Sequence, residues 1–249
     1  PDSRKMPVDI ALSLKKYPDL KQDDKVAVRV VDWRDGDRLP QGELIDILGA
    51  AGDNDAEMHA ILLEYNLPYR FEEQVEKAAN AIDGRITERD IAERRDMREV
   101  PTLTIDPADA KDFDDALSFR RLENGNYEVG VHIADVTHYV TEGSPLDDEA
   151  LKRGTSVYLV DRVIPMLPHA LSNGICSLNA GVDRLALSCL MDIDERGDLI
   201  SYRVAETVIR VDQRMSYTSV KKILEDEDPE EIEKYESLVS LFQLMHQLA

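Results

Sequence analysis

A short acidic loop is the part of this 249-residue chain whose residue types could carry out chemistry. Five aspartates fall within ten residues, at Asp106, Asp109, Asp112, Asp114 and Asp115. Carboxylates that are crowded into a partly buried site repel one another, and each close pair raises a pKa. Divalent cations remove this penalty, and Mg²⁺ prefers hard oxygen ligands such as aspartate. The loop therefore predicts a Mg²⁺ site.

A solvated charge run is the alternative interpretation of the same loop, and the acidic segment 225–231 is an example of such a run. The loop differs from it because apolar Ala108, Ala110 and Phe113 are interspersed among the aspartates, so part of the loop should face the interior. It also connects a predicted strand to a predicted hairpin, which limits its freedom. The residues alone leave a metal site and a structural or surface role both open.

A calcium loop of the EF-hand type is excluded, because such a loop requires Gly at its sixth position and Glu at its twelfth. Counted from Asp106, these positions are Lys111 and Leu117. Aspartates that hold Mg²⁺ commonly serve phosphoryl chemistry, in which paired ions activate a water and stabilise the leaving oxygen. The loop therefore favours a metal-dependent phosphodiesterase or phosphatase of unspecified substrate.

The elements around the loop predict an α+β fold. Strands are predicted where β-branched or alternating residues are bounded by turn residues, at 25–33, 42–48, 103–105, 116–121, 127–134, 185–193 and 199–209. The turn 34–37 separates the first two strands, and we expect this pair to be the remnant of a small β-barrel. Helices are predicted at 53–65, 72–82, 87–94, 145–153 and 229–249.

Helix starts are predicted from capping residues. The segment 53–55 should cap the first helix, Thr87 with Asp90 resembles a capping box, and Ser144 followed by Pro145 should begin a helix. One face of the first helix should carry Met58, Ile61, Leu62 and Tyr65. The last helix should carry an apolar stripe of Ile232, Tyr235, Leu238, Val239, Phe242 and Met245.

Composition narrows the class of protein. Hydrophobic residues make up 43% of the chain and charged residues 33%, as in soluble globular proteins, and neither a membrane-spanning run nor a secretory signal is present. The two cysteines, Cys176 and Cys189, form no metal-binding spacing, so we expect both to be small core residues. Low cysteine use is typical of a reducing compartment, and we therefore expect a cytoplasmic protein. The net charge of −21 is atypical of proteins that bind nucleic-acid phosphates.

The segment 94–179 nevertheless resembles the catalytic (RNB) domain of the ribonuclease II family, in its ribonuclease R branch. The resemblance consists of consecutive blocks in the family's order: 94–96 with 104–107, 112–116, 131–136, 153–158, 164–168, 171–174 and 176–179. The segment 52–59 is similar to the family's link between a cold-shock barrel and the catalytic domain.

This resemblance implies a domain organisation. Residues 1–49 should be the end of a cold-shock (OB-like) barrel, 50–100 a helical linker, and 101–249 the N-terminal part of a mixed α/β RNB domain. The family's other barrels and the second half of its catalytic domain, with a further acidic residue and an arginine, would lie outside this chain. We therefore expect a truncated piece that hydrolyses RNA weakly or not at all on its own.

The resemblance also implies site residues. The family's four catalytic aspartates correspond to Asp106, Asp112, Asp114 and Asp115, which would hold Mg²⁺, with Mn²⁺ as a substitute. Asp112 and Asp114 would be catalytic, and loss of Asp114 would stop the reaction. Tyr158 would pack against RNA near its 3′ end, since every base offers a π-face; an ordinary half-buried strand tyrosine is the alternative. Asp109 matches no catalytic position.

The function implied is a Mg²⁺-dependent hydrolytic 3′-to-5′ exoribonuclease that acts on single-stranded RNA, releases nucleoside 5′-monophosphates and works as a monomer away from membranes. A catalytically inactive RNA-binding regulator on the same fold is the alternative, and a metal-stabilised structural module is a third possibility that the charge favours. His132, Asp135 and His138 resemble metal-ligand spacing, but they should not share one face, so we expect structural roles.

Overall fold

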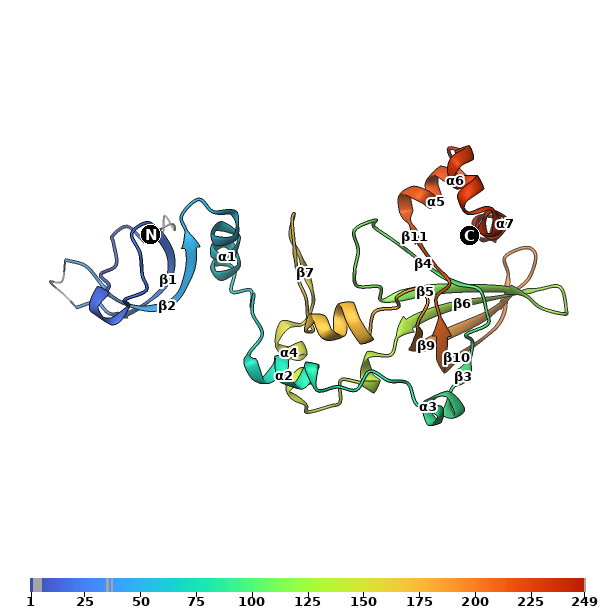
Figure 1. Cartoon of the computed structure of the whole chain (residues 1–249), viewed down its shortest axis with the longest axis horizontal. Helices are drawn as coiled ribbons and strands as arrows, with labels where there is room; N and C mark the ends of the chain where they lie inside the picture. Colours follow the sequence, from blue (N-terminus) through green and yellow to red (C-terminus); the bar gives the residue numbers. More distant parts are fainter. Residues whose placement is uncertain (2–5, 35, 37, 249) are drawn as a thin grey trace. The chain divides into compact units, whose positions relative to one another are not determined.

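The computed structural model describes residues 1, 6–34, 36 and 38–248 (Figure 1). The chain divides into two compact units, Pro1–Phe71 and Glu72–Ala249, which are described separately below. In the described part of the chain, no helix combines the length and the apolar character that a bilayer crossing requires.

The first unit is built on an antiparallel strand pair, β1 (Asp24–Asp32) and β2 (Gln41–Ala50), which confirms both predicted strands. The turn predicted between them includes Asp35 and Asp37, which lie outside the described residues. Ala11 forms a further bridge to Gln41, and a short 3-10 helix, η1 (Leu14–Lys16), precedes β1.

Helix α1 (Asn54–Glu64) completes this unit, but two details of its prediction are wrong. Asp53 makes no side-chain cap; instead, the Glu57 carboxylate accepts a hydrogen bond from the Gly52 N–H at 3.0 Å. Leu62 is buried as expected, whereas Ile61 and Tyr65 are exposed. The buried face is displaced because small Ala56 packs against Gly49 of β2, where an added Cβ would lie 3.3 Å away.

The second unit is organised by a seven-stranded mixed sheet in the order β11-β4-β5-β6-β9-β10-β3. Its strands are β3 (Arg95–Asp96), β4 (Thr102–Asp106), β5 (Asp115–Arg121), β6 (Tyr127–Ala134), β9 (Asp183–Ile193), β10 (Leu199–Arg210) and β11 (Gln213–Ser216). The central pairs are antiparallel, while β11 runs parallel to β4 and β3 parallel to β10. The predicted α+β class and both predicted hairpins are confirmed, but β3 and β11 were not predicted.

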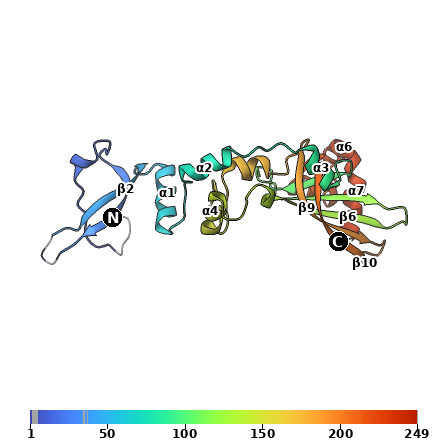
Figure 2. The same cartoon turned by 90° about the horizontal axis from the view of Figure 1, so that it is seen from below.

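Helices flank the sheet, and two of them begin at the predicted caps. They are α2 (Glu73–Asn80), α3 (Glu88–Glu93), α4 (Pro145–Arg153), α5 (Tyr217–Leu224), α6 (Pro229–Lys234) and α7 (Glu236–Leu248), with short η2 (Val136–His138) and the π-helical turn η3 (Ala170–Ile175). Thr87 and Asp90 form the predicted capping box, and the Ser144 hydroxyl accepts from the Asp147 N–H at 3.2 Å. Figures 1 and 2 both place α2 beside α4.

The predicted continuous helix 229–249 is wrong, because the chain breaks at Tyr235 into α6 and α7. Its apolar stripe is correct: Phe242 is buried, and Ile232, Tyr235, Leu238, Val239 and Met245 pack around it. The break lets both helices pack against α5, which one straight helix could not do (Figure 1). Ala249 lies outside the described residues.

A polar layer runs through the middle of the sheet. His132 of β6 is fully buried, and its ring nitrogens lie 2.8 Å from the Ser118 hydroxyl and 2.6 Å from the Ser188 hydroxyl. Burial lowers the pKa of His132 to about 4, so the ring is neutral at physiological pH. Neighbouring Gly130 leaves room for this ring, since an added Cβ would lie 2.7 Å from it. The predicted structural role of His132 is confirmed.

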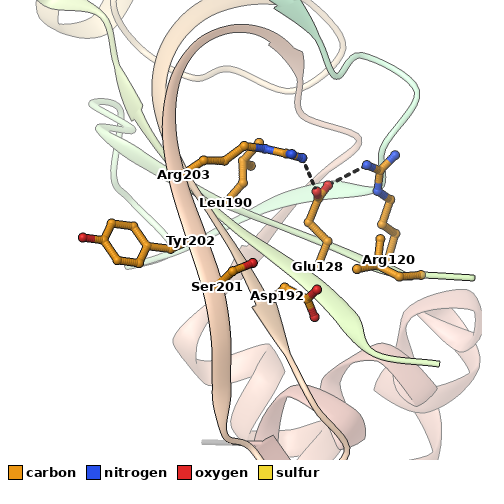
Figure 3. Close-up of a pocket in the computed structure, with 8 residues that line it drawn as sticks. Arg120, Glu128, Leu190, Asp192, Ser201, Tyr202 and Arg203 are labelled. Carbon is orange, nitrogen blue, oxygen red and sulfur yellow. Dashed lines mark hydrogen bonds and ion pairs between the residues drawn. The ribbon is translucent and has the colours of Figure 1, made fainter. Parts of the chain in front are cut away.

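A cluster of charged residues lies at the far end of the same sheet face. The buried carboxylate of Glu128 pairs with Arg120 and Arg203, both at 2.7 Å, and with Arg95 at 3.4 Å. Glu128, Arg120 and Arg203 line a cavity of about 370 Å³, together with Ser201 and Tyr202 (Figure 3). One carboxylate thus links strands β5, β6 and β10 with the segment that contains Arg95.

We expect Glu128→Gln to lower the free energy of unfolding by about 3 kcal/mol, because three guanidinium groups would then face one another without their shared counter-charge. The arginines reach solvent, so the loss should fall at the low end of values for broken buried pairs. Urea denaturation followed by circular dichroism measures it. The matched control is Glu195→Gln, whose ion pair with Arg121 is exposed and should contribute under about 1 kcal/mol. Equal losses in the two variants would contradict the prediction.

Candidate functional site

The acidic loop connects β4 to β5, as predicted. Asp106 is the last residue of β4, and Asp115 is the first residue of β5. These strands are antiparallel neighbours, so the last residue of β4 and the first residue of β5 lie at the same end of the strand pair. Asp112 and Asp114 come from the loop between them. Phe113 is buried and Ala110 packs against the core, whereas Ala108 is exposed and does not face the interior as expected.

The four aspartates lie close enough to affect one another's ionisation. Burial raises the pKa of Asp106, the negative charges of Asp115, Asp112 and Asp114 raise it further, and the positive charge of Arg214 opposes them. Partial burial likewise raises the pKa of Asp114, with added repulsion from Asp112 and Asp115. The fold therefore holds these carboxylates together against their mutual repulsion.

The same carboxylates have few partners. Asp106 Oδ2 is buried without a hydrogen bond, and no described residue gives a hydrogen bond or ion pair to the side chains of Asp114 and Asp115. Among the described residues, no three His, Cys, Asp or Glu side chains are gathered tightly enough to hold a metal ion. The four carboxylates therefore lie near one another and repel one another, but their oxygens do not converge on a single metal position. An oxygen donor set with an unsatisfied buried oxygen suits a hard divalent cation in its chemistry.

Tyr158 lies at this site. It belongs to the short hairpin of β7 (Val157–Tyr158) and β8 (Val163–Ile164), and its side chain is 65% exposed, so it is not an ordinary half-buried strand tyrosine. Its hydroxyl donates a hydrogen bond to Asp112 Oδ2 at 2.9 Å. Burial of the hydroxyl and this bond raise the pKa of Tyr158 to about 12. The structure thus presents an accessible aromatic ring beside the acidic loop.

Two residues that the sequence analysis did not single out hold the loop in place. The Ser177 hydroxyl accepts from the Phe113 N–H at 3.0 Å and donates to the Lys111 carbonyl at 3.1 Å. The Arg214 guanidinium donates to the carbonyls of Ala108 at 2.6 Å and Ala110 at 3.0 Å, and lies 4.8 Å from the centre of the Phe113 ring. Each contact joins segments far apart in sequence, so no spacing pattern could reveal it.

The other residues considered in the sequence analysis, Asp135, Cys176 and His138, make contacts typical of a structural role. Burial alone would raise the pKa of Asp135, but hydrogen bonds from Arg94 at 2.6 Å and from Thr137 keep it below its usual value. Cys176 is buried, and burial raises the pKa of its thiol to about 12, which disfavours a nucleophilic thiolate. His138 packs edge-on against the Tyr139 ring.

The raised pKa of Asp114 predicts a pH-dependent effect of Asp114→Asn. Between the ordinary value of 3.8 and the raised value, the folded chain binds more protons than the unfolded chain, so stability falls as pH rises through this window. At pH 7 the full penalty is present, and Asp114→Asn should raise the melting temperature measured in EDTA. The gain should shrink as the pH falls towards 3.8.

Differential scanning calorimetry between pH 4 and 8 measures this effect. Asp109→Asn is the control, because Asp109 is exposed in the same loop and the charges that raise the pKa of Asp114 are those of Asp112 and Asp115. A lower melting temperature for Asp114→Asn than for the wild type at pH 7 in EDTA would refute the prediction.

Comparison with known proteins finds a matching domain family for each of the two units. Residues 1–72 match the cold shock domain and residues 94–249 match the RNB domain. Ribonuclease R of Thermotoga maritima is 44% identical over 97% of this chain, which covers 34% of that protein. Ribonuclease R 1 of Lactococcus lactis is 46% identical over 84% of the chain, which covers 25% of that protein. The chain thus spans a quarter to a third of the length of these relatives.

Solved structures agree with this assignment. RNase R of Mycoplasma genitalium, in complex with double-stranded RNA, superposes with a TM-score of 0.80 at 27% identity, over 95% of this chain and 43% of that one. The chain therefore belongs to the family of proteins that carry an RNB domain, here preceded by a cold shock domain.

Proposed function

We propose that this chain contributes the acidic half of the active site of a Mg²⁺-dependent hydrolytic 3′-to-5′ exoribonuclease that degrades single-stranded RNA to nucleoside 5′-monophosphates. The supporting observation is that the fold holds four mutually repelling aspartates together, while no described residue gives a hydrogen bond to the side chain of Asp114 or Asp115. Carboxylates that cost stability without structural contacts indicate selection for chemistry. The membership of the RNB-domain family supports the reaction class.

The proposed metal ligands are Asp106, Asp112, Asp114 and Asp115, with Mn²⁺ able to replace Mg²⁺. Bound Mg²⁺ would supply charge stabilisation for an in-line attack of water on the terminal phosphodiester. The rigid ends of β4 and β5 orient Asp106 and Asp115, while the loop orients Asp112 and Asp114. Asp112 and Asp114 are the proposed catalytic residues, because they match the family's catalytic positions and the pKa of Asp114 is raised by burial and by the charges of Asp112 and Asp115.

Tyr158 is the proposed RNA contact. Its exposed ring offers a stacking surface for a base of any identity, and its hydroxyl is fixed to Asp112. A base stacked on this ring would bring the neighbouring phosphate towards the acidic loop. This arrangement favours a single strand, because a base paired within a duplex does not expose a face to an aromatic side chain.

Because the net charge of this chain is −21, we propose that most of the basic groups that bind RNA phosphates belong to other parts of the whole enzyme. We propose that the whole enzyme includes further RNA-binding surface, that the protein acts as a cytoplasmic monomer, and that this chain alone hydrolyses RNA weakly. The proposed division into barrel, linker and catalytic parts at residues 1–49, 50–100 and 101–249 belongs to the same proposal.

We expect the product of the complete reading frame that encodes this chain to shorten 5′-labelled single-stranded RNA from its 3′ end in Mg²⁺. Asp114→Asn should lower the rate by roughly 10⁴-fold, as loss of one member of a catalytic set commonly does. Gel analysis of timed samples measures both. Asp109→Asn is the matched control and should retain activity, because it removes an acid of the same loop that lies outside the proposed ligand set.

Three outcomes would contradict the proposal or part of it. RNA binding without cleavage by the wild-type protein would favour an inactive RNA-binding regulator on the same fold. Equal rates for Asp114→Asn and the wild type would place the chemistry elsewhere. Strong, EDTA-sensitive hydrolysis by the 249-residue chain alone would contradict the expected dependence on further domains.

A further inference from the structure

The backbone on both sides of Asp112 is bound by a single hydroxyl. The Phe113 N–H, which follows Asp112, donates to Ser177 Oγ at 3.0 Å. The Lys111 carbonyl, which precedes Asp112, accepts from the same oxygen at 3.1 Å. Ser177 is fully buried, so these bonds are shielded from competing water.

The next peptide group is bound by the same segment. The Leu178 N–H donates to the Phe113 carbonyl at 2.8 Å, which fixes the peptide that leads into Asp114. The Asp114 carbonyl in turn accepts from the Ala134 N–H of β6 at 2.9 Å. The backbone of both proposed catalytic aspartates is therefore anchored, while their carboxylates remain without backbone bonds.

Ser177 is itself held by a second residue. Arg184, at the start of β9, donates through Nε to the Ser177 carbonyl at 2.7 Å and through Nη2 to the Gly174 carbonyl at 3.1 Å. The Ser177 N–H also donates to the Gly174 carbonyl. A rigid strand of the sheet thus fixes the turn at residues 174–177, and the turn fixes the acidic loop.

We infer that Ser177 is a positioning residue for the proposed active site, setting the separation of Asp112 and Asp114 through the main chain. The inference rests on the proposed function, and it adds a residue that touches neither substrate nor metal. Without the Ser177 hydroxyl, a buried N–H and a carbonyl lose their partner, and the repulsion between the carboxylates is free to open the loop.

The test is Mn²⁺ binding to the 249-residue chain, followed by the electron paramagnetic resonance signal of free Mn²⁺. Ser177→Ala should weaken binding ten- to a hundred-fold, the usual effect of removing a group that orients metal ligands. Ser177→Thr keeps the hydroxyl but forces a methyl group into a filled site, so it should lower stability while largely retaining affinity.

Ser188→Ala is the matched control. Ser188 is equally buried and its hydroxyl also has two hydrogen-bond partners, but these are the side chains of His132 and Thr207, which lie in the sheet away from the loop. It should lose stability without losing Mn²⁺ affinity. If Ser177→Ala does not fold, Ser177→Cys replaces it, since a thiol keeps the volume and is only a weak donor and acceptor.

Weakened binding in Ser177→Ala or Ser177→Cys, with binding retained in Ser177→Thr and Ser188→Ala, supports the positioning role. Wild-type affinity in Ser177→Ala overturns it while leaving the proposed function intact. Affinity that merely follows stability across all variants also overturns it. A wild-type chain that binds no Mn²⁺ instead overturns the proposed metal site itself, and with it any site for Ser177 to position.

Discussion

Repulsion between carboxylates is the constraint on which the second unit of this protein depends. Burial and the negative charges of the neighbouring aspartates raise the pKa values of Asp106 and Asp114, so the folded chain carries an electrostatic cost at neutral pH. A free loop would relieve that cost by opening into water. The loop is prevented from opening because its two ends are strand ends, its middle is bound to Ser177, and its first half is bound to Arg214.

These anchors depend on the order and direction of the strands in the sheet. Arg214 reaches the loop because β11 runs parallel to β4 and places Ser216 opposite Asp106. Arg184 reaches the turn beneath Ser177 because it lies at the start of β9, at the centre of the sheet. The polar layer around His132 and the arginine cluster around Glu128 then hold the central strands in register. The rigidity of the site thus comes from contacts spread over the whole sheet.

Sequence reasoning reached the parts of this arrangement that are local. Alternating residues predicted the long strands and both hairpins, and capping residues predicted the starts at Thr87 and Ser144. The short strands β3 and β11 were not predicted, because two to four residues show no periodicity and because their parallel partners lie far along the chain. Ser177 escaped because it meets Phe113 across 64 residues, a separation that only the folded sheet defines. The break at Tyr235 escaped because the apolar stripe continues across it.

The two acidic runs of the chain show how structure separates chemistry from solubility. In the run 225–231, Asp228 caps α6 by accepting from the Glu230 and Glu231 N–H groups, and its neighbours lie in the first turn, where the helix dipole favours negative charge. The acids of this run cap the helix, lie in its first turn or face water, although one oxygen of Glu231 is buried without a hydrogen bond. In the loop 106–115 the carboxylates oppose one another, and the backbone around them is bound more tightly than their side chains. Composition cannot tell these runs apart, but the anchoring of the backbone can, because a protein that only needed charge would not build anchors to hold repelling groups together.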